Sequence, residues 1–106
     1  MNMSNFVKAA TIDEIPLGEM KSFKVGYENV LICHTETGFY AIANECTHDS
    51  APMTDGKLKG NIVMCRRHGA KFDITNGAVL GPPALVPLDS YPVKIEDNDI
   101  LVQLPD

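Results

Sequence analysis

The sequence lacks an apolar run long enough to cross a membrane, since no stretch of about 18 apolar residues occurs in its 106 residues. It also lacks the basic start and apolar stretch of a secretory signal. Basic residues are few: nine lysines and arginines against fourteen acids give a formal net charge of -5, which argues against nucleic acid as the main partner. We therefore expect one acidic, cytoplasmic domain over residues 1–106, with neither membrane nor nucleic acid as a partner.

Helical periodicity is almost absent. The one expected helical turn begins at Thr11, where Thr11 and Glu14 are spaced as a capping box. Asn76-Gly77 is the residue pair that a type I′ hairpin favours. Short runs rich in β-branched and aromatic residues fill the rest, at 30–33, 39–43, 62–65, 71–74, 91–95 and 100–104. The sequence predicts an all-β fold, a small antiparallel β-sandwich or barrel.

Three segments without a strand pattern interrupt this fold, at 45–54, 66–70 and 81–87, and we expect them to be functional loops. The first two carry paired cysteines and histidines: Cys46 lies two residues before His48, and Cys65 lies three residues before His68. The odd total of three cysteines does not suit a disulfide framework. The spacing instead predicts a metal site assembled from two loops.

Two kinds of metal site compete for these four residues. Two thiolates and two imidazoles suit structural zinc, but zinc sites usually pair cysteine with cysteine and histidine with histidine. Here each loop mixes the two types, which suits a two-iron cluster because each loop can then bind both irons. A Rieske centre has this ligand inventory, with two cysteines on one iron and two histidines on the other.

The segments Cys46-Thr47-His48 and Cys65-Arg66-Arg67-His68-Gly69 resemble the two signature motifs of Rieske iron–sulfur proteins. The match extends over roughly residues 40–95 and includes the Gly- and Pro-rich stretch from Gly81. Among Rieske proteins, the sequence is most similar to the soluble ferredoxins of bacterial ring-hydroxylating oxygenase systems. One departure is Arg66-Arg67, where many relatives have proline and an apolar residue.

The resemblance implies one [2Fe-2S] cluster, with the buried iron held by Cys46 and Cys65 and the outer iron by His48 and His68. It implies a β domain with a loop-built cluster-binding subdomain. High-potential relatives have serine where this chain has Ala70, so we expect a potential at the lower end of the Rieske range.

The resemblance also implies an electron carrier, not an enzyme, that takes electrons from a flavin-dependent NAD(P)H reductase and passes them to a terminal oxygenase. A terminal oxygenase needs a second iron held by two histidines and a carboxylate, and His34 is the only histidine left over. Two alternatives stay open: a Rieske-type small subunit of a reductase such as nitrite reductase, and a zinc-stabilised interaction module. We expect a monomer that meets its partners transiently.

Two further features concern one pair of residues outside the motifs and one pair within them. Cys33 and His34 occur in an apolar strand-like run, where packing is a better explanation than metal ligation. Arg66 and Arg67 precede His68 directly, so they are candidates for a basic docking surface next to the cluster.

Overall fold

The computed structural model describes residues 6–47, 52–66, 69–82 and 84–105. These residues form three antiparallel sheets and two 3₁₀ turns, with no α-helix among them. The outer sheet has the order β1 (Phe6–Thr11), β11 (Asp99–Gln103), β10 (Val93–Glu96). The middle sheet has the order β2 (Met20–Val25), β3 (Glu28–Thr35), β4 (Gly38–Ala43), β9 (Ser90–Tyr91). The loop sheet has the order β5 (Lys57–Lys59), β6 (Ile62–Met64), β7 (Lys71–Asp73), β8 (Val79–Gly81).

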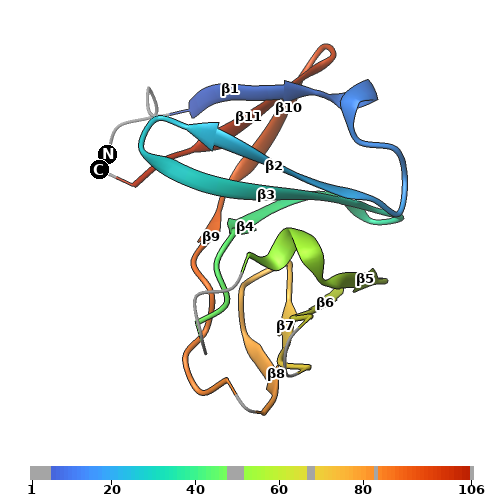
Figure 1. Cartoon of the computed structure of the whole chain (residues 1–106). Helices are drawn as coiled ribbons and strands as arrows, with labels where there is room; N and C mark the ends of the chain where they lie inside the picture. The colour runs from blue at the N-terminus through green and yellow to red at the C-terminus, as the bar shows by residue number, and fades with distance from the viewer. Residues whose placement is uncertain (1–5, 48–51, 67–68, 83, 106) are drawn as a thin grey trace.

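The middle sheet lies between the outer sheet and the loop sheet (Figure 1). It is shared between two cores because side chains alternate across β3. Val30 and Ile32 point into the core that the middle sheet forms with the outer sheet. Leu31 and Cys33 point into the core that it forms with the loop sheet. All four side chains are 0% exposed, which explains why this strand reads as a continuous apolar run.

The core between the middle sheet and the loop sheet contains the residues that matter for the metal site. The aromatic side chain of Phe72 is completely buried there. Cys46 and Cys65 belong to the same cluster of buried side chains. The loop sheet is therefore attached to the rest of the fold through the core into which the two cysteines are packed.

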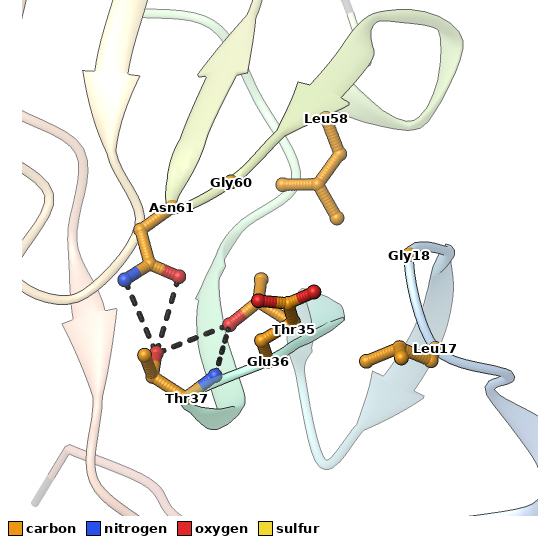
Figure 2. A pocket seen from close by; sticks show the side chains of 8 residues that line it. All are labelled: Leu17, Gly18, Thr35, Glu36, Thr37, Leu58, Gly60 and Asn61. Carbon is orange, nitrogen blue, oxygen red and sulfur yellow. Dashed lines mark hydrogen bonds between the residues drawn. The ribbon is translucent and has the colours of Figure 1, made fainter.

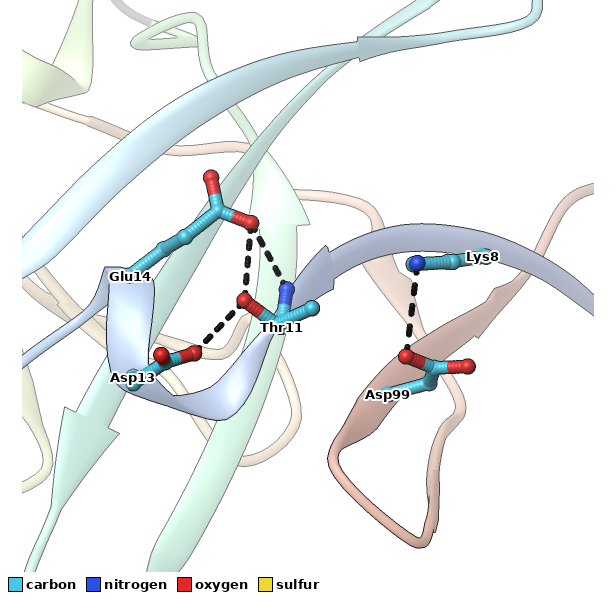
Figure 3. A network of polar contacts seen from close by, with 5 residues as sticks. All are labelled: Lys8, Thr11, Asp13, Glu14 and Asp99. Carbon is cyan, nitrogen blue, oxygen red and sulfur yellow. Dashed lines mark hydrogen bonds and ion pairs between the residues drawn. The ribbon is translucent and has the colours of Figure 1, made fainter.

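The turn expected at Thr11 forms as a 3₁₀ turn, η2 (Ile12–Glu14), and Figure 3 shows its polar contacts. The backbone N–H of Thr11 donates to the Glu14 carboxylate at 2.8 Å, and this hydrogen bond lowers the pKa of Glu14. Beside it, Lys8 of β1 and Asp99 of β11 form an ion pair at 3.4 Å across the outer sheet. No helix in the described part of the chain has the length and apolar character to span a membrane.

The structure corrects two sequence expectations. The run 91–95 is not one strand: it divides into β9 in the middle sheet and β10 in the outer sheet, because Pro92 has no N–H to donate to a ladder. Asn76-Gly77 does not form a type I′ turn, which needs positive φ at both residues. Gly77 has φ +80°, but Asp97 is the one non-glycine residue with positive φ in the described part of the chain.

The turn at Asn76-Gly77 is stabilised instead by hydrogen bonds to Asp73. The Asp73 side chain accepts hydrogen bonds from the backbone and hydroxyl of Thr75, and the Asp73 carbonyl accepts from Gly77. This Asx-type turn is longer than a two-residue hairpin and separates β7 from β8. Four strands were not expected from the sequence: β1, β2, β5 and β8.

Candidate metal centre

The three loops expected at 45–54, 66–70 and 81–87 lie at the loop sheet and at its junction with the middle sheet. Hydrogen bonds of backbone or side-chain groups close each loop at its base. The first is closed between Asn44 and Thr54, where the Asn44 side-chain oxygen accepts from the Thr54 N–H at 2.9 Å and from its hydroxyl at 2.8 Å. Residue 54 belongs to the 3₁₀ turn η3 (Met53–Asp55), so the irregular part of this loop is shorter than the expected 45–54. Cys46 lies just inside this closure.

The second loop is closed by its own first and last residues. The Cys65 N–H donates to the Ala70 carbonyl at 2.7 Å, and the Gly69 N–H donates to the Cys65 carbonyl at 3.1 Å. Gly69 has φ +77°, a left-handed conformation that glycine adopts without strain. The sequence thus brings the chain back on itself within six residues and fixes Cys65 at the root of the loop.

The third loop is held at Gly77 and Leu88. The Leu88 N–H donates to the Gly77 carbonyl at 2.8 Å, and a Cβ added at Gly77 would collide with the Leu88 carbonyl oxygen. Any larger residue at Gly77 would therefore push this loop away. Gly81, expected in the loop, is instead the last residue of β8.

The structure brings Cys46 and Cys65 into one buried core, where they are 0% and 1% exposed. His48 and His68, the other two predicted ligands, lie outside the described residues. The described residues alone contain no group of three or more potential metal-ligating side chains. The four-residue ligand set therefore stays a prediction, with its two cysteines placed at the roots of neighbouring loops.

The surroundings of the two cysteines fit an iron–sulfur cluster. Both are packed among apolar side chains, including Met53, Ala70 and Phe72. Burial disfavours a free thiolate, as at Cys33 in the same core, where it raises the thiol pKa to about 12. Metal ions deprotonate a coordinating thiol and compensate its charge, so thiolates can occupy such a setting as ligands.

The comparisons with known proteins decide the family. A family model described as the Rieske [2Fe-2S] domain matches residues 5–92. This chain belongs to the Rieske [2Fe-2S] family. Its cofactor is accordingly one [2Fe-2S] cluster, which sets aside the zinc-stabilised module that the sequence had left open.

Curated relatives match over almost their whole length. The ferredoxin component of the naphthalene 1,2-dioxygenase/salicylate 5-hydroxylase systems of Ralstonia sp. is 35% identical over 100 residues, covering 94% of this chain and 96% of the relative. The biphenyl dioxygenase ferredoxin subunit of Pseudomonas sp. strain KKS102 is 37% identical over 98 residues, covering 92% and 90%.

Solved structures agree with the Rieske fold. The ferredoxin of carbazole 1,9a-dioxygenase from Nocardioides aromaticivorans IC177 has a TM-score of 0.88 at 29% identity, covering 92% of this chain and 96% of that one. A complex of reduced oxygenase and oxidized ferredoxin in carbazole 1,9a-dioxygenase includes a chain with a TM-score of 0.86 at 25% identity, covering 93% of each. A putative nitrite reductase small subunit has a TM-score of 0.80 at 20% identity, covering 92% and 96%, which is a likeness of fold alone.

Of the remaining candidate residues, Cys33 and His34 have structural roles. Cys33 is completely buried in β3, as expected for a packing residue. The His34 ring stacks on Phe39 with centroids 3.9 Å apart, and its Nδ1 lies 2.8 Å from the Ile15 carbonyl oxygen. Arg66 is exposed and lies 4.0 Å from Asp55, whereas Arg67 is outside the described residues.

A pocket of about 400 Å³ lies away from the cysteines, between the β3–β4 turn and the β5–β6 turn (Figure 2). Thr37 and Asn61 hydrogen-bond across it, with the Asn61 amide donating to the Thr37 hydroxyl at 3.1 Å. Cys46 and Cys65, the two predicted ligands that the structure describes, do not line this pocket. The contact joins the middle sheet to the loop sheet.

The loop-closing roles of Asn44, Thr54 and Gly77 were not predicted from the sequence. Nor was the role of Thr47, whose hydroxyl donates to the Val86 carbonyl at 2.6 Å. The position of Thr47 between two predicted ligands was the one sequence feature that indicated a role for it at the metal centre. Its partner lies 39 residues away along the chain, so the contact itself could be seen only in the folded protein.

Proposed function

We propose that this protein is the electron carrier of a multi-component oxygenase, passing single electrons from a flavin-dependent NAD(P)H reductase to a terminal oxygenase. The observation that supports the proposal most is the burial of Cys46 and Cys65 in one core at the roots of two loops, in a chain of the Rieske family. The relatives named as dioxygenase ferredoxin components match nearly end to end, which favours a carrier of the same kind.

The four ligands belong to this proposal. The thiolates of Cys46 and Cys65 would hold the buried iron, and the imidazoles of His48 and His68 the outer iron. When bound, the cluster supplies a one-electron redox centre. The protein's own part is to bind it, to keep one side in an apolar core and to present the other side on loops that a partner can approach.

The chain carries electrons and is not itself the oxygenase. Oxygenase chemistry of this kind needs a mononuclear iron on two histidines and a carboxylate. With His48 and His68 assigned to the cluster, His34 is the remaining histidine, and one histidine cannot complete such an iron site. Its ring is stacked on Phe39 and hydrogen-bonded to the Ile15 carbonyl. A reductase and an oxygenase are therefore the expected transient partners, and the carbazole dioxygenase complex supports the second of them by likeness.

The single-domain organisation over residues 1–106, with cluster loops at 45–54, 66–70 and 81–87, is part of the same proposal. It is supported by the middle sheet, whose two faces serve both cores. We also propose that the protein is a cytoplasmic monomer, in keeping with the net charge of -5 and the transient nature of electron-carrier contacts.

Metal analysis and electron transfer test the proposal together. The purified protein should be red-brown and contain two irons and two acid-labile sulfides per chain, as a [2Fe-2S] cluster requires. After chemical reduction, it should reoxidise on mixing with a terminal oxygenase component, such as that of a naphthalene or biphenyl dioxygenase system. Zinc without iron would contradict the cofactor. A loaded protein that transfers no electron to any oxygenase component would contradict the function.

A further inference from the structure

The first and third loops continue the pairing of β4 with β9 beyond the sheet. The ladder pairs Ala41 with Tyr91 and Ile42 with Ser90, and the Ala43 N–H then donates to the Asp89 carbonyl at 2.9 Å. Beyond this point the two segments separate around a cavity of about 340 Å³, which is lined by residues of 43–47 and 86–89 and includes Cys46. They meet again where the Thr47 hydroxyl donates to the Val86 carbonyl at 2.6 Å.

The segment 84–88 is anchored by burial at its two ends but not in its middle. Ala84 and Leu88 are 2% and 3% exposed and belong to the core that contains both cysteines. Between them, Leu85 is 90% exposed and Val86 is 57% exposed, so little burial of apolar surface fixes this part. The hydrogen bond from the Thr47 hydroxyl is a side-chain tether at this part of the segment.

We propose that Thr47 is a positioning residue of the redox centre: by donating to the Val86 carbonyl, its hydroxyl holds segment 84–88 closed beside the Cys46 loop and restricts the access of water and small solutes to the cluster. The inference rests on the proposed ligands Cys46 and His48, which flank Thr47 in the sequence. It goes beyond the ligand set, because it assigns to the residue between the ligands the control of a loop 39 positions away.

The size of the effect follows from the energetics of one hydrogen bond. An intramolecular hydrogen bond contributes roughly 0.5–1.5 kcal/mol net, and 1.4 kcal/mol corresponds to a factor of ten in an equilibrium constant. Loss of the Thr47 hydroxyl should therefore raise the population in which segment 84–88 is open by up to about tenfold. Any process that proceeds through this open state should accelerate by the same factor.

Two substitutions and a control isolate the hydroxyl. Thr47→Val keeps the branched shape and removes the donor, whereas Thr47→Ser keeps the donor. The matched control is Thr37→Val, which removes the hydroxyl that accepts a hydrogen bond from the Asn61 amide at 3.1 Å in the pocket of Figure 2. For each holoprotein, iron release to an iron(II) chelator after reduction is timed, and amide hydrogen exchange of the segment 84–88 is followed by mass spectrometry.

Thr47→Val should release iron up to about tenfold faster than the wild type. Its Leu88 amide, which donates to Gly77, should exchange faster by a similar factor. Thr47→Ser should restore both rates, and Thr37→Val should leave both unchanged. A loaded Thr47→Val protein with wild-type release and exchange rates would overturn this inference alone. Wild-type protein that binds no iron would overturn the proposed function and this inference with it.

Discussion

Arg66 Nη1 lies 4.0 Å from Asp55 Oδ2, and the two side chains are 72% and 56% exposed. Ion pairs with this exposure contribute about 0–1 kcal/mol, because water screens the charges and both side chains stay mobile. Among the described residues, the ion-pair partner of Arg66 therefore holds it only weakly. Its guanidinium is available to a partner beside the loop that begins at Cys65, in a protein whose net charge is -5.

Reversing the charge of Arg66 and Arg67 should slow electron transfer to the terminal oxygenase. In an Arg66→Glu, Arg67→Glu variant we expect an intact cluster spectrum and a rate about tenfold lower at low salt, because charge steering acts mainly on association. The wild-type rate should fall with added salt, since exposed charges are screened beyond about 8 Å at physiological ionic strength. Stopped-flow mixing across a salt series measures both effects.

Asp55→Asn is the matched control for that variant, because it removes an acid 4.0 Å from Arg66 without touching either arginine. It should raise the low-salt rate slightly. An unchanged rate in the double variant, with cluster and fold intact, would place the docking surface elsewhere on the molecule.

The sequence predicted the parts of the fold in which periodicity is strong. The central strand β3 was evident because both of its faces are apolar, and the Cys and His motifs were evident because their spacing is local. Strands β5 and β8 were missed because β5 has one apolar residue between two lysines and β8 ends in glycine, whereas the equally short β6 is apolar throughout. The division of 91–95 between two sheets depends on which neighbour each half meets, although Pro92 marks the break.

At the metal centre, too, local sequence patterns could be predicted and contacts between distant residues could not. Ligand types and loops could be inferred from residues close together in the sequence, whereas the hydrogen bonds that close the loops join distant residues such as Asn44 with Thr54 and Thr47 with Val86. Such contacts leave no periodic trace. They become visible only when the pairing of β4 with β9 brings the two segments together.

Cys33 should be dispensable for the cluster. It is completely buried in β3 and pairs with Tyr40 of β4, so its role is packing. Cys33→Ala should keep the visible spectrum and the iron content while lowering the free energy of unfolding by about 1 kcal/mol. Cys46→Ala or Cys65→Ala should abolish the cluster. Iron lost from the Cys33 variant would show that the ligand set is wrong.

The buried Cys33 thiol should also make the protein less stable in alkali. Burial raises its pKa from 9.0 to about 12 in the folded state, so between these values the unfolded chain releases a proton that the folded chain retains. Stability from this group is complete below pH 9 and declines as the pH rises toward 12. At pH 10.5 the loss is about 2 kcal/mol, from about 1.4 kcal/mol per pH unit.

Cys33→Ala provides the measurement, because the variant lacks this titration and shares every other group. Urea unfolding at pH 8 should show the wild type as the more stable protein. At pH 10.5 the order should reverse. Parallel pH profiles for the two proteins would mean that Cys33 ionises in the folded state as easily as in the unfolded one.

His48→Cys should lower the reduction potential if the cluster still forms. The substitution replaces a neutral imidazole with a thiolate, and the added negative charge disfavours the reduced state. We expect a shift toward the value of about -400 mV that all-cysteine plant-type clusters show. Protein-film voltammetry measures it, with the wild type expected below about 0 mV within the Rieske range of about -150 to +300 mV. A rise in potential would contradict the assignment of His48 as a ligand.

Ala70→Ser should raise the potential, because it adds a hydroxyl at the base of the second loop. Ala70 is 0% exposed, and its carbonyl accepts from the Cys65 N–H at 2.7 Å, so a hydroxyl on its Cβ would lie within the buried surroundings of Cys65. Hydrogen bonds to the sulfurs stabilise the reduced, more negative cluster. If one such bond favours the reduced state by about 1.4 kcal/mol, the potential rises by about 60 mV for one electron.

The control for this change is Ala41→Ser, which introduces the same hydroxyl at a buried site in the other core, where Ala41 is 2% exposed. It should lower stability, as burial of an unpaired hydroxyl does, and leave the potential where it was. A shift of equal size in both variants would point to a change in the whole fold. A wild-type reduction potential near +300 mV would mean that another hydrogen-bond donor already acts on the cluster sulfurs, in the way expected of a serine hydroxyl at position 70.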